Sequence, residues 1–136
     1  MRRNAIIVGG GRVGCHTAEQ LIEHDYTVTV IERDAETCQQ LTTQQVNQII
    51  EADGTNAETL QQADAANADI VAALTDNAQT NVTICELARE IAPDVRTLAR
   101  VARDGEQEYQ HRTAIDNIVY PAAAGADLAV DRLLRN

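Results

Sequence analysis

A chain of 136 residues is long enough for one ordinary domain with a single sizeable core. Its formal net charge of −10 argues against nucleic acid as a partner and against an anionic lipid surface, because a strongly acidic protein repels both. All 11 basic residues are arginine, and this composition is typical either of a plain solvated surface or of adaptation to high salt.

The sequence contains no signal for secretion or for crossing a membrane. No apolar stretch approaches the roughly 20 residues that span a bilayer. The run that follows the basic start, Ala5–Val8, is too short for the apolar region of a signal peptide. We therefore expect a soluble, cytoplasmic protein without direct membrane insertion.

Three cysteines, Cys15, Cys38 and Cys85, lie far apart and form no Cys-x-x-Cys pair. This spacing argues against both a disulfide framework and a zinc site. Each cysteine falls in a stretch with helical spacing. We expect all three to be small buried apolar residues, and we expect no metal site.

Short runs rich in β-branched residues alternate with stretches of helical spacing along the whole chain. The expected strands are Ala5–Val8, Thr27–Ile31, Gln48–Ile50, Ile70–Leu74, Thr97–Ala99 and Ile118–Tyr120. Such near-continuous apolar strands are typical of a parallel sheet that is buried on both faces. The alternation predicts a doubly wound α/β Rossmann fold, with a mostly parallel six-stranded sheet and helices on both faces. Residues 1–136 would form this one domain, with the last helix starting at about residue 121.

The first expected strand ends in a glycine-rich turn. Gly9, Gly11 and Gly14 form the pattern G-x-G-x-x-G between that strand and the first expected helix. Gly9 permits the tight turn, Gly11 lets a phosphate approach the backbone, and Gly14 lets the helix pack closely on the sheet. The free N–H groups at the start of the helix would then point at the phosphate. The stretch therefore predicts a loop that holds a diphosphate.

The second expected strand leads into Glu32, which lies 18 residues after Gly14. A carboxylate at this place accepts hydrogen bonds from the ribose hydroxyls of an adenosine. Glu32 would repel a 2′-phosphate, so NAD(H), ATP or ADP is favoured over NADP(H). Arg33 opposes this preference, because an arginine beside the acid can accommodate that phosphate.

Several further motifs follow in order at regular positions. They are Gly9-Gly10-Gly11-Arg12-Val13-Gly14, Ile31-Glu32-Arg33-Asp34, Ala52-Asp53-Gly54-Thr55, Ala73-Leu74-Thr75-Asp76 with Asn81, Leu98-Ala99-Arg100-Val101, and Tyr120-Pro121 with Gly125-Ala126. Together they resemble the regulator-of-potassium-conductance domain, known as RCK, KTN or the TrkA N-terminal domain. The resemblance covers the chain from about Asn4 to Leu134.

The resemblance implies roles for particular residues. Arg12 and Arg100 would lie near the phosphates, and the arginine at the Arg12 position reaches across a dimer in some members. Asp53, next to Gly54, would lie by the adenine, while Thr75 and Asp76 would line the ribose and phosphate edge.

Each of these residues also has a purely structural interpretation. Asp53 before Gly54 could belong to a turn, and Thr75 or Asp76 could cap the fourth helix. Arg100 could be a surface charge. For Asn81, a role at a ligand and a role in packing remain equally open.

Two features depart from the family pattern. Asp53-Gly54 inverts the commoner Gly-Asp order, and the usual C-terminal lobe is absent from these 136 residues. The chain would be either the nucleotide-binding half alone or a minimal stand-alone member.

Binding without chemistry is the simplest functional hypothesis. A dehydrogenase needs a catalytic group held at the nicotinamide, and no such group stands out; His111 and Tyr109 fall in the fifth helical stretch. The resemblance implies a cytoplasmic regulatory domain, not an enzyme. It would bind NAD(H), or ATP or ADP as the alternative, and gate a potassium channel or transporter at the inner face of the membrane.

The resemblance also implies partners. These are a second copy of the chain, in a homodimer or a larger assembly, and a membrane channel or transporter subunit. The last helix is a candidate dimer surface through Leu128, Leu133 and Leu134, although we expect part of it to pack on the sheet. The alternatives are the cofactor-binding portion of an NAD-dependent oxidoreductase and a regulator of another cation transporter. A redox-sensing transcription factor would need a DNA-binding segment, which neither the charge nor the length provides.

Overall fold

The computed structural model describes residues 3–41, 46–102 and 112–135. Six strands form one sheet in the order β3-β2-β1-β4-β5-β6, and every pairing between them is parallel. Their bounds are β1 Arg3–Val8, β2 Tyr26–Glu32, β3 Gln48–Glu51, β4 Ile70–Ala73, β5 Arg96–Arg100 and β6 Asn117–Val119. The predicted Rossmann fold is confirmed, and each expected strand is found to within two residues.

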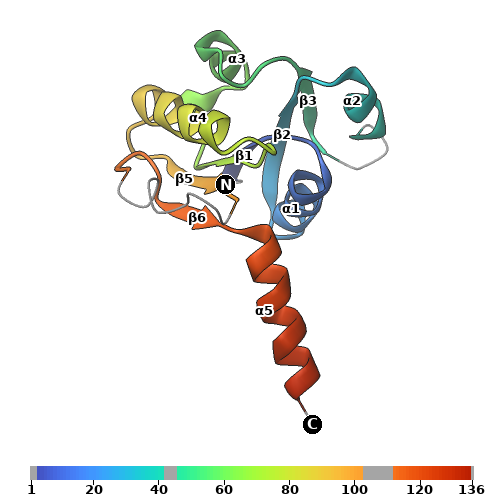
Figure 1. The fold of residues 1–136 in the computed structure, drawn as a ribbon. Coiled ribbons are helices and arrows are strands. Elements are labelled where there is room, and N and C mark those ends of the chain that lie inside the picture. Colours follow the sequence, from blue (N-terminus) through green and yellow to red (C-terminus); the bar gives the residue numbers. More distant parts are fainter. Residues whose placement is uncertain (1–2, 42–45, 103–111, 136) are drawn as a thin grey trace.

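Helices connect these strands, as the alternation in the sequence predicts (Figure 1). The connecting helices are α1 Arg12–Glu23, α2 Ala35–Leu41, α3 Ala57–Gln62 and α4 Ala78–Ile91, with a short 3-10 turn at Ala65–Asn67. Helix α5, Pro121–Leu134, follows the last strand, β6. The fifth helical stretch, with Tyr109 and His111, falls on residues 103–111 and lies outside the described residues.

The sheet is buried on both faces because successive side chains of each strand point to opposite sides. In β1, Ala5 and Ile7 join one core cluster, which includes Ala18 of α1 and Leu41 of α2. The alternate residues of β1 join the other cluster, with side chains from α3 and α4. Two apolar layers thus sandwich the sheet, and this explains why the strands are apolar almost throughout.

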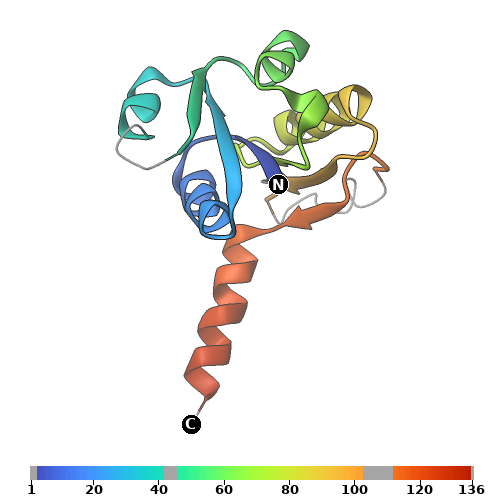
Figure 2. The ribbon, with the colours of Figure 1, turned by 180° about the vertical axis from the view of Figure 1, so that it is seen from behind.

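Helix α5 departs from the expectation that it packs partly on the sheet. It has no buried residue, and it extends away from the sheet toward the C-terminus (Figures 1 and 2). Leu133 is 80% exposed and Leu128 52% exposed. The prediction of packing within the chain is wrong for most of the helix, because residues 124–135 are all exposed among the described residues.

The cysteines follow the prediction in two cases of three. Cys38 and Cys85 are buried, whereas Cys15 is partly exposed on α1. Burial raises the pKa of the Cys85 thiol to about 12, so this thiol stays protonated at neutral pH. Among the described residues, no helix is long and apolar enough to cross a membrane.

Candidate nucleotide-binding site

A cavity of about 320 Å³ opens at the C-terminal ends of the central strands. It lies at the point where the strand order reverses between β1 and β4, which is where doubly wound folds bind their ligands. Nine of the residues that the sequence singled out line it: Gly9, Gly11, Glu32, Arg33, Asp53, Gly54, Thr75, Asp76 and Arg100. Gly10, Arg12, Val13 and Gly14 do not line this cavity.

Gly9 makes the turn out of β1. Its φ of +103° lies in a region that other residues rarely adopt, and its amide donates to Ile31 O at 2.8 Å. A Cβ built on Gly9 would lie 2.8 Å from the backbone nitrogen of Thr75. The turn therefore needs glycine for its conformation and also for its close approach to the end of β4.

Gly14 and Gly10 allow close packing around the glycine loop without lining the cavity. A Cβ on Gly14 would overlap the carbonyl oxygen of Gly9, so Gly14 sets how closely α1 approaches the loop. A Cβ on Gly10 would lie 2.5 Å from Leu41 Cδ1 of α2. These two glycines serve packing, which explains why they do not line the cavity.

Gly11 serves a different purpose. It is the N-cap residue of α1, has an extended backbone, and offers no side-chain cap. The first amide of α1 to close a helical hydrogen bond is that of Cys15, which donates to Gly11 O at 2.8 Å. The preceding amides are left without acceptors within the helix. A Cβ on Gly11 would meet nothing within 4 Å. Open space thus lies beside the positive end of a helix dipole, an arrangement that suits an anion.

Glu32 is fixed in place before any ligand arrives. Its Oε1 accepts from the amide of Gly10 at 2.7 Å, and its Oε2 accepts from the amide of Asp34 at 2.9 Å. An ionised carboxylate has about four acceptor sites, so each oxygen can accept one more hydrogen bond. Glu32 therefore links the glycine loop to the end of β2 and still offers acceptors at the cavity.

Asp53 combines the two interpretations that the sequence allowed. Its Oδ1 accepts from the amide of Thr55 at 2.9 Å and from its hydroxyl at 2.7 Å, which is turn chemistry. These hydrogen bonds hold the pKa of Asp53 below its ordinary value. A Cβ on the buried Gly54 would overlap Val8 Cγ1, so the inverted Asp-Gly order places glycine where β1 requires it. Asp53 still lines the cavity.

The fourth helix is capped by a residue that the sequence analysis did not consider. Asn77 accepts from the amide of Thr80 through Oδ1 at 2.9 Å, so neither Thr75 nor Asp76 caps α4. The hydroxyl of Thr75 instead lies 2.6 Å from Asn81 Oδ1. Asp76 is exposed at the rim of the cavity.

Asn81 is fully buried and joins the ends of two strands. Its Nδ2 donates to Thr75 O at 3.0 Å and to Arg100 O at 2.7 Å, while its Oδ1 accepts from the amide of Thr75 at 3.1 Å. The side-chain amide of Asn81 is therefore bonded to other groups of the protein. Among the described residues, it links the end of β4 to the end of β5. Its packing role is clear from these contacts.

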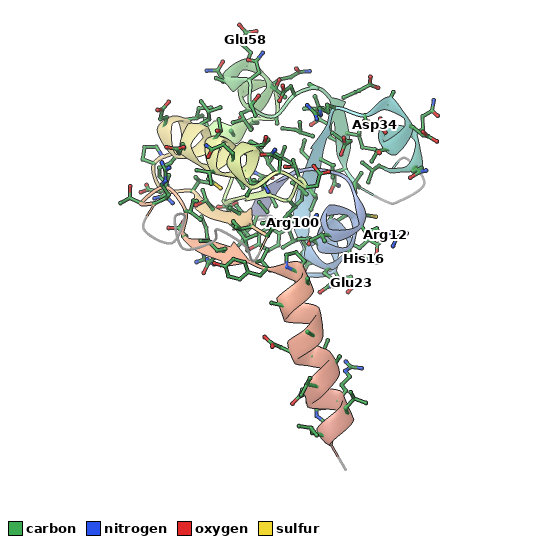
Figure 3. All side chains as sticks on the ribbon, in the orientation of Figure 1. Arg12, His16, Glu23, Asp34, Glu58 and Arg100 are labelled. Atoms are coloured by element: carbon green, nitrogen blue, oxygen red, sulfur yellow. The ribbon has the colours of Figure 1, made fainter. Side chains whose placement is uncertain are left out.

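The two candidate phosphate arginines lie in different places. Arg100 lies at the end of β5 and lines the cavity. Arg12 lies on α1 near His16 (Figure 3) and borders a second hollow, between α1 and α2, with Cys15 and Thr37. The structure of a single chain therefore brings Arg100, but not Arg12, to the cavity.

Three residues of α4 and its N-cap line the cavity although the sequence did not predict them as site residues. Asn77, Thr80 and Ile84 come to the cavity from the first two turns of α4. Their spacing of three and four residues places them on one face of the helix, which could have identified them once Thr75 was assigned to the site.

Comparison with known proteins identifies the family. The family model of the TrkA-N domain matches residues 5–121. The chain belongs to the TrkA-N domain family. The Trk system potassium uptake protein TrkA homolog of Methanothermobacter thermautotrophicus is 33% identical over 121 residues, which are 89% of this chain. The match spans 56% of that relative's length, so the chain corresponds to about half of it.

Solved structures share the TrkA-N fold. The TrkA-N domain of the inner membrane protein YbaL from Escherichia coli is 26% identical with a TM-score of 0.83, covering 99% of this chain and 98% of that one. GsuK bound to ADP has 23% identity and a TM-score of 0.78, covering 97% of this chain and 34% of that one. The GsuK channel bound to NAD has 18% identity and a TM-score of 0.73, covering 88% and 21%.

Proposed function

We propose that this TrkA-N domain binds a nucleotide in the cavity and regulates a potassium channel or transporter without catalysing a reaction. The observation that carries the proposal is the glycine loop. Open space lies beside Gly11 at the start of α1, and the carboxylate of Glu32 is anchored next to it by the amide of Gly10. The names of the relatives support the link to potassium uptake.

NAD(H) is the favoured ligand, with ATP or ADP as the alternative. Glu32 offers acceptors for the two hydroxyls of an unmodified ribose and would repel a 2′-phosphate. Arg33 is exposed at the cavity, and it is the residue that would relax this preference. The neighbouring folds bound to ADP and to NAD support both kinds of ligand.

The regulatory step requires at least two copies of the domain. We propose that α5 carries the contact between copies, because its exposed Val130, Leu133 and Leu134 have no partner within the described chain. The nucleotide would bias the gate of a membrane partner only through its different affinities for two arrangements of these copies. For this role the protein would act in the cytoplasm, at the inner face of the membrane.

Calorimetry tests the proposal. NADH, NAD⁺, ATP, ADP and NADPH are titrated in high salt into the wild type and into Glu32→Ala. The matched control is Glu51→Ala, which removes the same charge from the neighbouring position on β3, outside the cavity lining.

We expect NADH to bind equally well to the wild type and to Glu51→Ala. Its binding to Glu32→Ala should be at least about tenfold weaker, because roughly two hydrogen bonds to a charged acceptor are lost. Absence of binding for all five nucleotides would overturn the proposed function.

A further inference from the structure

The strands β4 and β5 part from each other at the edge of the cavity. Their paired register ends at Ala73 and Ala99. The next residue after β4, Leu74, donates its amide to β1 at 2.7 Å, whereas Arg100 of β5 pairs with β6. The end of β4 is thus bonded to the half of the sheet that carries the glycine loop, and the end of β5 to the half that leads to α5.

Asn81 bridges the ends of these two strands. Its Nδ2 donates to Thr75 O at 3.0 Å and to Arg100 O at 2.7 Å, while its Oδ1 accepts from the amide of Thr75 at 3.1 Å. The hydroxyl of Thr75 donates to the same Oδ1 at 2.6 Å, nearer than its other acceptor, Asn77 O at 3.2 Å, and it accepts from the amide of Asn77 at 3.3 Å. Both donors and both acceptor sites of the Asn81 amide are therefore used. We call these four hydrogen bonds of Asn81 the clamp.

The clamp lies behind the cavity and not in its lining. Asn81 is fully buried and does not line the cavity, whereas Thr75 and Arg100 both do. A ligand that contacts Thr75 and Arg100 would hold together the same two strand ends that Asn81 holds from behind. Asn81 would therefore act on the ligand only through these two residues.

The end of β5 continues this connection to the start of α5. The amide of Val101 donates to Val119 O at 3.0 Å, and the next residue, Tyr120, is the N-cap residue of α5. Tyr120 also packs against the core cluster that contains Val101. Because β6 leads directly into α5 (Figure 1), a shift of the end of β5 carries the start of α5 with it.

The position of Tyr120 at the start of α5 carries a cost in free energy. Among the described residues, its hydroxyl is buried without a hydrogen-bond partner. A buried hydroxyl that is left unpaired is destabilising, so this position depends on the packing of the strands beside it. The start of α5 is therefore a segment that responds to how firmly the end of β5 is held.

We propose that Asn81 is a positioning residue through which occupancy of the cavity fixes the start of α5. The proposal rests on the proposed function and names the residues that carry its regulation. When a ligand bridges Thr75 and Arg100 in front of the clamp, local opening of β6 and of the start of α5 becomes rarer. By linkage, whatever fixes the start of α5 also tightens the ligand.

Hydrogen exchange followed by mass spectrometry measures this opening in the full chain, with and without saturating NADH. The readout is the exchange rate of peptides from residues 118–124, none of which lines the cavity. Asn81→Ala removes the clamp. The matched control is Asn56→Ala, which removes the N-cap side chain of α3 outside the cavity lining. Calorimetry verifies binding, and thermal melting verifies that each variant is folded.

In the wild type we expect NADH to slow exchange at residues 118–124 by at least about fivefold, the lower end of ordinary coupling between two sites. Asn56→Ala should show the same slowing. Asn81→Ala should still bind NADH through the glycine loop, more weakly than the wild type, but saturating NADH should leave its exchange at 118–124 unchanged. A purely structural role of Asn81 would lower the melting temperature and leave the slowing by NADH intact.

A milder pair of variants decides the question if Asn81→Ala does not fold. Thr75→Val removes the hydroxyl that donates to Asn81 Oδ1, at nearly constant volume, whereas Thr75→Ser keeps a hydroxyl there. At saturating NADH, Thr75→Ser should retain the slowing at residues 118–124 and Thr75→Val should lose most of it.

Binding of NADH to the wild type without any slowing at residues 118–124 would overturn the inference and leave the proposed function intact. The same holds if the slowing is equal in the wild type and in Asn81→Ala, or equal in Thr75→Ser and Thr75→Val. Failure of NADH to bind to the wild type would instead overturn the proposed function.

Discussion

At the scale of single residues, the contact between Gly14 and Gly9 decides whether the glycine loop can form. A methyl group on residue 14 would overlap the carbonyl oxygen of Gly9, and a backbone atom in a tight turn has little freedom to move. We predict that Gly14→Ala lowers the free energy of unfolding by about 2–3 kcal/mol, as over-packing typically does. Urea unfolding followed by circular dichroism measures it.

Gly125 provides the matched control for this prediction. It lies inside α5, and a Cβ there would meet nothing within 4 Å. Gly125→Ala should raise helix stability by about 0.5–1 kcal/mol, because alanine loses less backbone entropy in a helix. A Gly14→Ala protein as stable as the wild type would show that the loop is not packed as described.

At the scale of elements, a polar cluster attaches the edge strand β6 to β5. Asp116, directly before β6, accepts from Arg89 Nη2 at 2.6 Å and from the amide of Thr97 at 2.9 Å. The amide of Asp116 donates to Thr97 Oγ1 at 3.0 Å. Burial opposes ionisation of Asp116, but the hydrogen bonds from Thr97 and Arg89 outweigh it and lower its pKa. The cluster also positions the start of α5, which follows β6 directly.

The pH dependence of Asp116→Asn tests this cluster. Because the folded-state pKa lies below the unfolded one, ionised Asp116 stabilises the fold above about pH 4, and this contribution is lost as the pH falls through the folded-state value. We predict that the variant is less stable by about 1 kcal/mol at neutral pH, since the carboxylate is partly exposed and screened. The difference from the wild type should shrink below about pH 4.

The control for Asp116 is Asp94→Asn, which changes an exposed acid in the turn before β5. Urea unfolding at a series of pH values measures both variants. A difference between Asp116→Asn and the wild type that stays constant from neutral to acid pH would contradict the role of the charge.

The exposed apolar face of α5 is a second feature at the scale of elements. Ala126, Val130 and Leu133 follow one another at spacings of four and three, so they share one face of the helix, and Val130 and Leu133 are exposed large apolar residues. If this face joins two copies, Leu133→Asp should convert the wild-type dimer to a monomer in analytical ultracentrifugation. Leu128→Asp, on the opposite side with Arg132 and Arg135, should remain dimeric. A wild type that is monomeric at every concentration would contradict the proposed contact.

At the scale of the whole molecule, the net charge of −10 makes the compact state repel itself. Screening by salt relieves this repulsion, because the Debye length falls from about 30 Å at 0.01 M to about 3 Å at 1 M. We predict that the melting temperature rises with sodium chloride over this range by more than it does with sucrose at equal osmolality. A melting temperature that is independent of salt would contradict this.

The sequence predicts the sheet well because both of its faces are buried by the chain itself. Alternate residues of β1 enter different core layers, so the strand has to be apolar throughout, and that pattern is visible without a structure. The glycine loop is visible in the sequence for a similar reason, since the spacing of Gly9 and Gly11 between a strand and a helix is a local feature, and both residues line the cavity.

The features that the sequence did not predict depend on contacts over long distances. Thr75 and Asn77 are both good capping residues, and only the clamp from Asn81 to the end of β5 commits Thr75 elsewhere. The apolar pattern of α5 resembles that of a buried helix, and periodicity alone cannot tell burial within a chain from burial by another copy. Arg12 lies outside the cavity because the first turn of α1 directs it toward α2.

The central claim, that the open space at Gly11 receives the phosphates of a nucleotide, is tested most directly by titrating NADH into the wild type and into Gly11→Ala. The added methyl group meets nothing within 4 Å in the protein, so the variant should fold with nearly unchanged stability. Because the methyl group occupies the phosphate position, NADH binding should weaken by at least about a hundredfold, the cost of displacing the diphosphate from the loop amides. Equal affinity of NADH for the two proteins would show that the loop does not hold the diphosphate.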